Sequence, residues 1–412
     1  SLIFVLYSNC CISQDYWEFV NSPDSVDIFD IAVDSEGRIY LACPYSLGNL
    51  TGIFRSDNNC ETWQRKVNGM ATTWSPITRS ITSDNNGTLI VGCNDRIYRS
   101  VDSGENWNEV YSIGYIYNKA EFGYDSIFLV GGGYQFGIVR SGDNGLTWEP
   151  VLNYEDFEPV YEEATTGICF GPDANIYVCS RTYVGGYGSV YISEDLGLTW
   201  SVFFNDGFSQ FRSIGFDQNG KLLVGTNGLY RYDFQLENWE FHYYNMVPIE
   251  MLFVGDSRIY LACDGNSGGV SGIVFSNDIG ETYSTLNSGL EPPSAEDFAI
   301  DGVGRILVSG IGYRLFRSYD TLMTKIKAPG EIQNQSPFTC YPNPVDDFLY
   351  IKSTIDQEAT IKIWSQLGNQ IVESNLIPFE ISIMSFQTYN PGLYLVQITT
   401  NKMVYVFKII HI

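Results

Sequence analysis

The chain has 412 residues and a formal net charge of −25, with 40 glycines, 29 tyrosines and 25 phenylalanines. This mixture favours strands and tight turns over helices. The negative charge disfavours nucleic acids and anionic membranes as partners, because binding them requires clustered Lys and Arg. No run of about 18 apolar residues follows the first segment, so no membrane-spanning helix is predicted.

Residues 1–13 are predicted to be the later part of a secretory signal peptide. The segment SLIFVLYSNCCIS is apolar at its start and then turns polar. Cys11 and Ser13 are small enough to flank a cleavage before Gln14. A buried first strand is the alternative interpretation, and lipid attachment at Cys10 or Cys11 is disfavoured by the residues before them.

A short motif, Ser-x-Asp-x-Gly-x-Thr-Trp, recurs through the first three quarters of the chain, and we call it the box. Its copies begin at residues 56, 100, 141, 193, 232, 276 and 318, so successive intervals are 44, 41, 52, 39, 44 and 42 residues. The copy at 56 has Asn58 in place of Asp, the copy at 232 has lost most polar positions, and the last ends at Asp320. This period is typical of β-propeller blades.

Two apolar strands joined by a polar turn precede each box, as in residues 28–43 and 211–226. Each repeat therefore supplies strands A, B and C, then the box as a turn, and then strand D beginning at Trp. Seven A–B–C sets are present, but only six fourth strands follow them. The missing strand is YWEFV at residues 16–20, which matches NWNEV and TWEPV. We therefore predict an all-β, seven-bladed propeller whose N-terminal strand completes the last blade and removes an exposed edge.

The box residues are expected to be structural. The Asp carboxylate, or the Asn58 amide, can accept backbone N–H groups of its own turn. The glycine supplies positive φ, and the Trp side chain buries a flat surface between blades. This role is assigned to Asn58, Asp102, Asp143, Asp195, Asp278, Asp320, Trp63, Trp107, Trp148 and Trp200.

The repeat resembles the Asp-box (BNR) repeat of sialidases, xyloglucan hydrolases, the sortilin receptor family and photosystem assembly factors. The resemblance covers about residues 14–325 and rests on five good copies in register. It implies that the box is a folding device located away from the active face. It identifies the blade and leaves the chemistry open.

Nine cysteines are present, yet disulfides are not expected. Cys43, Cys93 and Cys263 fall at one equivalent strand position, where other repeats carry Gly, Ser or Thr. Such residues act as small core fillers on separate blades. We expect mostly free, buried thiols.

Alternating strand directions place the A–B turns and the boxes on one face of the ring, the box face. The B–C and D–A loops lie on the other, the loop face, where a ligand is expected. The 52-residue interval has its extra length in two of these loops, residues 153–167 and 181–188. They should be neighbours rich in aromatic and acidic side chains, which suit sugars or a cationic partner. An ordinary solvated loop is the alternative. The candidate binding residues are Tyr154, Phe157, Tyr161, Glu162, Tyr183 and Tyr187.

No catalytic residue, metal site or cofactor is predicted, and an enzymatic role is disfavoured but left open. With only His242 and His411, a His-based triad or multi-His metal site is improbable. Sialidase chemistry needs an arginine cluster, for which Arg79 and Arg212 are the inward candidates. A carboxylate-pair glycosidase stays open because Asp and Glu are abundant and the pairing is spatial.

The C-terminal 75 residues change in pattern. After a polar linker at 328–337, short alternating strands with Gly turns over 338–412 predict a small β-sandwich. This part resembles the type A C-terminal sorting domain of the type IX secretion system of Bacteroidota, through Pro342, Asn343, Pro344, Gly368, Pro391, Gly392, Tyr394 and Lys408. The resemblance implies export through that machinery, followed by release or anchoring at the cell surface.

These features predict residues 1–13 as a partial signal peptide, 14–327 as the propeller, 328–337 as a linker and 338–412 as the sorting domain. The favoured function is a secreted or cell-surface propeller, monomeric, that binds a glycan or a protein. A glycan-active hydrolase with a carboxylate pair is one alternative. An assembly or stability factor for another exported protein is the other.

Overall fold

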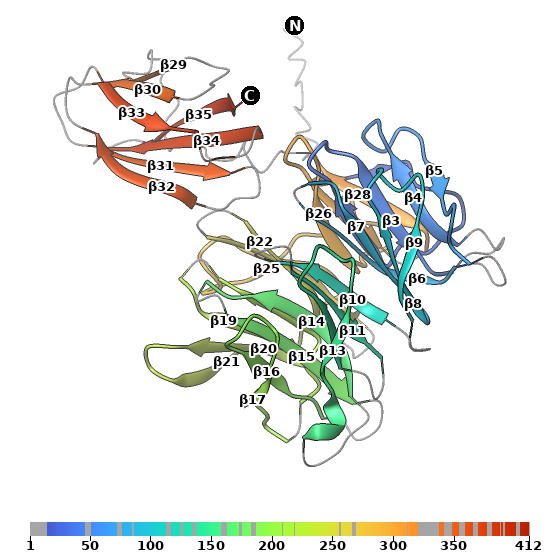
Figure 1. Ribbon diagram of the computed structural model, residues 1–412. Helices are drawn as coiled ribbons and strands as arrows, with labels where there is room; N and C mark the ends of the chain where they lie inside the picture. The colour runs from blue at the N-terminus through green and yellow to red at the C-terminus, as the bar shows by residue number, and fades with distance from the viewer. Residues whose placement is uncertain are drawn as a thin grey trace, which may run out of the picture. The chain divides into compact units, whose positions relative to one another are not determined.

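The computed structural model describes residues 15–319 and 338–411, apart from 46–50, 72–75, 85, 113–116, 124–126, 134–136, 158–162, 173–174, 183–186, 208, 218, 255–256, 266–268 and 311 in the first range, and 342–347, 354–358, 366–369, 377–380, 388, 390–391 and 401–403 in the second. The chain divides into two compact units, one ending at Thr321 and one beginning at Leu322 (Figure 1). Within the described residues no helix is long and apolar enough to cross a membrane.

The first unit consists of seven four-stranded antiparallel sheets, the blades of a propeller. Blades 1 to 3 are formed by β2 (Asp30–Val33), β3 (Ile39–Cys43), β4 (Gly52–Ser56) and β5 (Gln64–Lys66); β6 (Thr78–Ser83), β7 (Leu89–Cys93), β8 (Arg96–Ser100) and β9 (Asn108–Ser112); and β10 (Tyr117–Phe122), β11 (Phe128–Gly132), β12 (Ile138–Ser141) and β13 (Glu149–Leu152). Blades 4 and 5 are formed by β14 (Glu163–Phe170), β15 (Ile176–Thr182), β16 (Val190–Ser193) and β17 (Ser201–Phe204); and β18 (Ser213–Phe216), β19 (Leu222–Thr226), β20 (Gly228–Asp233) and β21 (Asn238–Tyr244). Blades 6 and 7 are formed by β22 (Pro248–Val254), β23 (Arg258–Cys263), β24 (Gly272–Ser276) and β25 (Ser284–Thr285); and β26 (Asp297–Ile300), β27 (Ile306–Gly310), β28 (Arg314–Ser318) and β1 (Trp17–Val20).

The first strand of each blade contacts that of the next blade, from β2 through β6, β10, β14, β18 and β22 to β26, and β26 contacts β2. The ring is therefore closed (Figure 1). Strand β1 pairs antiparallel with β28, with Trp17 opposite Ser318 and Val20 opposite Leu315. The predicted seven blades and the completion of the last blade by the N-terminal strand are confirmed.

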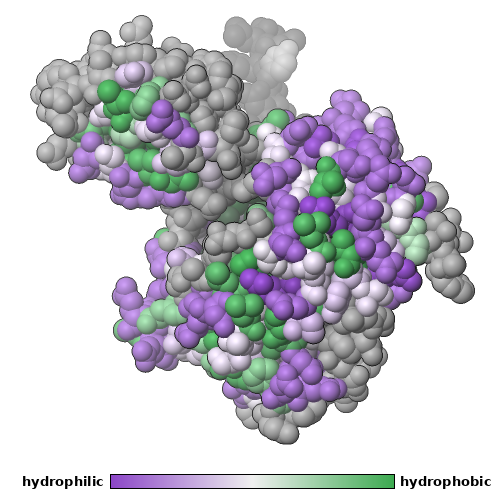
Figure 2. Space-filling view, in the orientation of Figure 1, coloured by the Kyte–Doolittle hydropathy of each residue, from purple (hydrophilic) through white to green (hydrophobic). Residues whose placement is uncertain are grey.

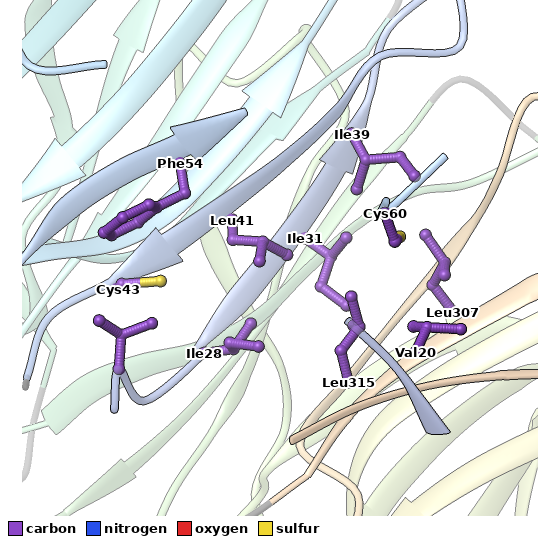
Figure 3. Close-up of a cluster of buried hydrophobic side chains, with 11 residues drawn as sticks. Val20, Ile28, Ile31, Ile39, Leu41, Cys43, Phe54, Cys60, Leu307 and Leu315 are labelled. Carbon is purple, nitrogen blue, oxygen red and sulfur yellow. The ribbon is translucent and has the colours of Figure 1, made fainter. Parts of the chain in front are cut away.

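The seam between blades 7 and 1 is held by apolar packing (Figure 3). Val20 of β1 and Leu315 of β28 lie in one buried cluster with Ile31 and Leu41 of blade 1. The indole of Trp17 is 1% exposed and donates its Nε1–H to the Leu286 carbonyl of blade 6 at 2.6 Å. The N-terminal strand thus contributes both its backbone pairing with β28 and the buried side chain of Trp17 to the ring.

The boxes form tight turns stabilised by their own side chains. In the third copy, Asp143 Oδ1 accepts the Ser141 hydroxyl at 2.9 Å and the Thr147 backbone N–H at 2.8 Å, and Oδ2 accepts the Thr147 hydroxyl at 2.6 Å. These hydrogen bonds, with that of the Thr147 hydroxyl the largest, lower the pKa of Asp143 to about 2. Gly145 has φ +78°, which suits a residue without a side chain. Asp102, Asp195 and Asp278 accept equivalent bonds, and Asn58 accepts them through its amide oxygen.

The box tryptophans divide into two kinds. Trp63 and Trp107 donate Nε1–H to a backbone carbonyl outside their own blade, Asn21 and Lys66 respectively, each at 3.0 Å. Trp148 and Trp200 donate instead to the glycine carbonyl of their own box, at 3.1 and 3.2 Å. Asp320 lies outside the described residues.

Cys43, Cys60, Cys93, Cys169, Cys179 and Cys263 are free thiols, and all but Cys169 are buried. Burial raises the pKa of the Cys60, Cys179 and Cys263 thiols to about 12. The prediction of mostly free, buried thiols is confirmed for the cysteines that the structure describes.

The second unit is a small β-sandwich. One sheet contains β29 (Phe338–Tyr341), β30 (Phe348–Ser353) and β33 (Ile381–Ser385); the other contains β31 (Ala359–Ser365), β32 (Gln370–Leu376), β34 (Gly392–Thr399) and β35 (Val404–His411). Its core includes Leu349, Ile361, Phe386 and Val396. Gly392 begins β34, Tyr394 is buried, and Lys408 of β35 is opposite Leu395. Pro342, Asn343 and Pro344 lie outside the described residues.

Candidate functional site

A cavity of about 420 Å³, the central cavity, lies where the first strands of the blades begin. All seven blades contribute to it, and B–C and D–A connections adjoin it, so it opens on the loop face. Its lining contains four cationic and five acidic side chains. The lining residues are Phe29, Asp30, Arg79, Lys119, Ala164, Thr165, Thr166, Arg181, Arg212, Ile249, Glu250, Asp264, Glu296 and Asp297.

β-Bulges place several of these residues. The pairing of β6 with β7 shifts between Thr78 and Ser80, so Arg79 is the extra residue. The same kind of register shift makes Thr166 the extra residue in β14, where that strand pairs with β15, and Ile249 the extra residue in β22, where that strand pairs with β23. A bulge re-aims a side chain and raises local twist, and here all three extra residues line the central cavity.

An ion pair crosses the cavity. Lys119 on β10 of blade 3 donates from Nζ to Glu250 Oε2 on β22 of blade 6, at 2.5 Å. Both side chains are largely buried, with 16% and 22% exposed. Because the partners come from blades on opposite sides of the ring, the pair spans the central cavity.

Two carboxyl groups join blades 7, 1 and 2 beside this ion pair. Asp297 Oδ2 accepts the Ile31 N–H at 2.7 Å, and Asp30 Oδ2 accepts the Ile81 N–H at 2.8 Å. The two side chains also hydrogen-bond to each other. Burial and the nearby Asp30 charge raise the pKa of Asp297 well above its usual value, and burial also raises the pKa of Asp30, so the two carboxyl groups resist ionising together. Both groups therefore connect blades.

Glu121, two residues along β10 from Lys119, belongs to the same charged group. Burial raises its pKa to about 8; Lys119 opposes the shift, and Glu250 and Asp30 reinforce it. In the folded chain Glu121 keeps its proton at pH values where the unfolded chain has released it. The contribution of Glu121 to the free energy of unfolding is therefore largest below about pH 4.5, and it decreases as the pH rises towards 8.

Glu121→Gln should flatten this pH dependence, because the amide resembles the protonated acid and does not titrate. We expect the decline in stability between pH 5 and pH 8 to be about 1–3 kcal/mol smaller in the variant, a range discounted for partial solvent access. Urea unfolding of both chains across this pH range measures it. Glu149→Gln, at an exposed position, is the matched control, and parallel curves for wild type and Glu121→Gln would contradict the assignment.

Arginines occupy the rim of the central cavity. Arg79 donates to the Tyr45 hydroxyl at 2.6 Å, and its guanidinium lies 5.8 Å from the centre of the Phe29 ring and 5.6 Å from that of Tyr45. Arg212 lies 3.8 Å from Asp264. Sequence reasoning named Arg79 and Arg212 as inward candidates but missed Arg181, Lys119, Asp30, Glu250 and Asp297.

The loop residues predicted to bind ligand are placed differently. Tyr154 is 1% exposed; its hydroxyl is 2.7 Å from that of Thr165, and its ring packs on Tyr191. The cause is local: Asn153 caps a short 3-10 helix, η2 (Tyr154–Asp156), which turns Tyr154 into the core. The expectation that Tyr154 presents its ring to a ligand is therefore corrected.

The other loop candidates lie away from the cavity or outside the described part. Phe157 packs against Tyr191 at the edge of the same core, with ring centres 5.1 Å apart. Tyr187 is half-buried, with its N–H bonded to Thr182 Oγ1. Neither lines the central cavity. Tyr161, Glu162 and Tyr183 lie outside the described residues, so their roles stay predictions.

The visible surface of the propeller is mostly hydrophilic (Figure 2). Hydrophobic residues form small patches interrupted by polar ones. The central cavity itself is lined mainly by charged side chains.

Comparisons with known proteins support both units. Residues 339–412 match the secretion system C-terminal sorting domain. Solved structures similar to the chain include YCF48 bound to a D1 peptide (15% identity, TM-score 0.57, covering 76% of this chain and 98% of that one). They also include PorZ, a surface component of the type IX secretion system of Porphyromonas gingivalis (14%, 0.55, 95% and 60%), and a GH74 enzyme of Niastella koreensis (14%, 0.54, 96% and 67%).

No curated protein matches the chain. The chain spans only 60% of the length of PorZ, and at these identities the structural likeness shows the fold alone. The sorting domain directs type IX export to the cell surface or the medium. The chain is a seven-bladed β-propeller that carries a C-terminal sorting domain of the type IX secretion system.

Proposed function

We propose that this protein is a ligand-binding propeller, displayed at the cell surface or secreted, and that its ligand occupies the central cavity. The observation that carries the proposal is the convergence of all seven blades on one charged cavity on the loop face. By contrast, the polar side chains of the boxes bond within their own turns.

The lining favours a polar ligand. Guanidinium and carboxyl groups offer donors and acceptors, and Phe29, which is partly exposed, offers an aromatic face at the rim. Convergent polar groups around a concave site are the usual basis of specific recognition. A glycan or a peptide segment meets these requirements. A peptide ligand is supported by the YCF48 structure, which is similar in fold and is described as bound to a D1 peptide.

Ile249→Trp should abolish ligand binding, because the larger side chain at a cavity-lining bulge would fill much of the space. The wild-type chain is first screened against glycan and peptide arrays, and affinities for the hits are then compared by calorimetry. Leu198→Trp, at a half-exposed position in the fourth-blade box, is the matched control and should bind like wild type. Unchanged affinity in the properly folded Ile249→Trp variant would place the ligand elsewhere.

A glycan-active hydrolase is the second candidate, favoured by the carboxyl groups of Asp30, Glu250 and Asp297 in the cavity. Glycosidases need two carboxyl groups roughly 5–10 Å apart. Asp30 and Asp297 instead share a direct hydrogen bond, and Glu250 is paired with Lys119. Turnover of aryl glycosides by the wild-type chain, lost in Glu250→Gln, would favour the hydrolase over the binding module.

An assembly factor for another exported protein is a form of the same binding role, with a protein as ligand. Co-purification of one stoichiometric partner with wild type, and its loss with Ile249→Trp, would identify it.

A further inference from the structure

Two arginines of the central cavity lack close carboxylate partners. Arg181, near the end of β15, has no ion pair or side-chain hydrogen bond to any residue that the structure describes. Arg212, directly before β18, lies 3.8 Å from Asp264, beyond hydrogen-bonding distance. Its Nε–H is buried and has no acceptor among the described residues.

The propeller pairs its other buried arginines more closely with carboxylates, although the Nε–H groups of Arg55 and Arg231 also lack an acceptor among the described residues. Arg231 donates to Asp217 at 2.8 Å and to Glu281 at 2.9 Å, and Arg55 donates to Glu105 and Asp57, each at 2.9 Å. Arg140 donates to the Leu196 carbonyl at 2.7 Å. The weak pairing of Arg181 and Arg212 is therefore a local property of the cavity.

The electrostatics of this corner favour an anion. Burial lowers the pKa of Arg212, the positive charge of Arg181 lowers it further, and Asp264 compensates only in part. Two cationic groups close together in a partly desolvated site are costly unless a counter-charge meets them. Nearby Thr165 and Thr166 cannot supply it, because a hydroxyl group is neutral, and theirs donate to the Gly137 and Phe211 carbonyls.

We propose that Arg181 and Arg212 bind a carboxylate group of the ligand. A guanidinium presents a planar fork of donors that matches a carboxylate, and the unused Nε–H of Arg212 is one such donor. The ligand is then an acidic one, either a uronic-acid glycan or a peptide with a free C-terminus. With a net charge of −25 the chain as a whole repels anions, so recognition depends on short-range contacts and not on long-range attraction. The assignment rests on the proposed binding function.

Paired ligands test the assignment. Oligogalacturonates and their methyl esters, and acetylated tripeptides as free acids and as amides, are titrated into the full chain by calorimetry. We expect the acids of one series to bind and their neutral counterparts to bind at least 10-fold more weakly; which series binds identifies the source of the carboxylate. Arg181→Gln and Arg212→Gln should each weaken acid binding about 10- to 100-fold, the range for a charge-assisted hydrogen bond. Arg96→Gln, which removes a surface arginine paired with Glu109, is the matched control and should bind like wild type.

Three results would overturn the assignment: neutral ligands binding as tightly as acids, arginine variants of wild-type stability binding as tightly as wild type, or no acid binding at all. Failure of the proposed function is distinguishable. Suppose a neutral ligand does not bind Ile249→Trp but binds both arginine variants as tightly as wild type. This result would reject the carboxylate assignment and keep the central cavity as the binding site.

Discussion

Trp17→Ala is expected to lower the free energy of unfolding of the propeller by about 3–5 kcal/mol, the usual cost of removing a fully buried tryptophan. The side chain is 1% exposed and its Nε1–H bond to Leu286 joins blade 7 to blade 6. The change leaves a cavity between blades 6 and 7 and an unpaired Leu286 carbonyl. Urea unfolding of the full chain measures the loss.

Phe19→Ala is the matched control, because Phe19 lies on the same strand and is 61% exposed. Its expected cost is below about 1 kcal/mol. Equal effects of the two substitutions would show that β1 does not anchor the ring. A chain that begins at residue 22 should in addition self-associate, because it leaves the edge of β28 unpaired.

Lys119→Met is expected to destabilise the propeller by about 3–5 kcal/mol at neutral pH. Removing one member of a buried ion pair leaves its partner charged and unpaired. Here the partner Glu250 also has Asp30, Glu121 and Asp297 as acidic neighbours, so Lys119 is the only cation that acts on all of them among the described residues. Urea unfolding at pH 7.5 and at pH 5 measures the effect.

The loss should be smaller at pH 5, where more of these carboxyl groups carry protons. The double variant Lys119→Met with Glu250→Gln should recover part of the loss, since it removes the orphaned charge. Arg96→Met, which breaks a pair with Glu109 whose side chains are 33% and 42% exposed, is the control and should cost far less than Lys119→Met. A Lys119→Met penalty that is equal at both pH values and is not relieved in the double variant would contradict an electrostatic role.

Short sequence motifs were enough to predict the blade. The four best copies of the box, at residues 100, 141, 193 and 276, each contain their own acceptor, their own left-handed glycine and their own aromatic anchor, so short-range hydrogen bonding specifies the turn. The repeat count then predicted the ring, because Trp17 was the only box-like tryptophan without a blade of its own. Only closure of a sheet could use that strand.

The aromatic residues of the loop at 153–167 show that sequence alone did not predict which side chains are buried. Tyr154 belongs to an acidic, Tyr-rich loop, and from composition it was expected at the surface. A single turn capped by Asn153 places it in the core instead, against Tyr191 of another strand. Residue type alone does not distinguish a buried tyrosine from an exposed one, because its ring is apolar and its hydroxyl is polar.

The sequence by itself determined the repeat, the number of blades, the closing strand and the sorting domain, because each is recognised from short motifs within a segment. The closing strand is one of these: it matches the other fourth strands in sequence, although it pairs with β28 about 300 residues away. The tertiary structure alone decided the central cavity. Its lining comes from seven blades, its key ion pair joins residues 131 positions apart, and several of its side chains are placed by bulges that no local pattern marks. A site assembled from one or two residues per repeat leaves almost no trace in any single segment, since its geometry exists only when the ring closes.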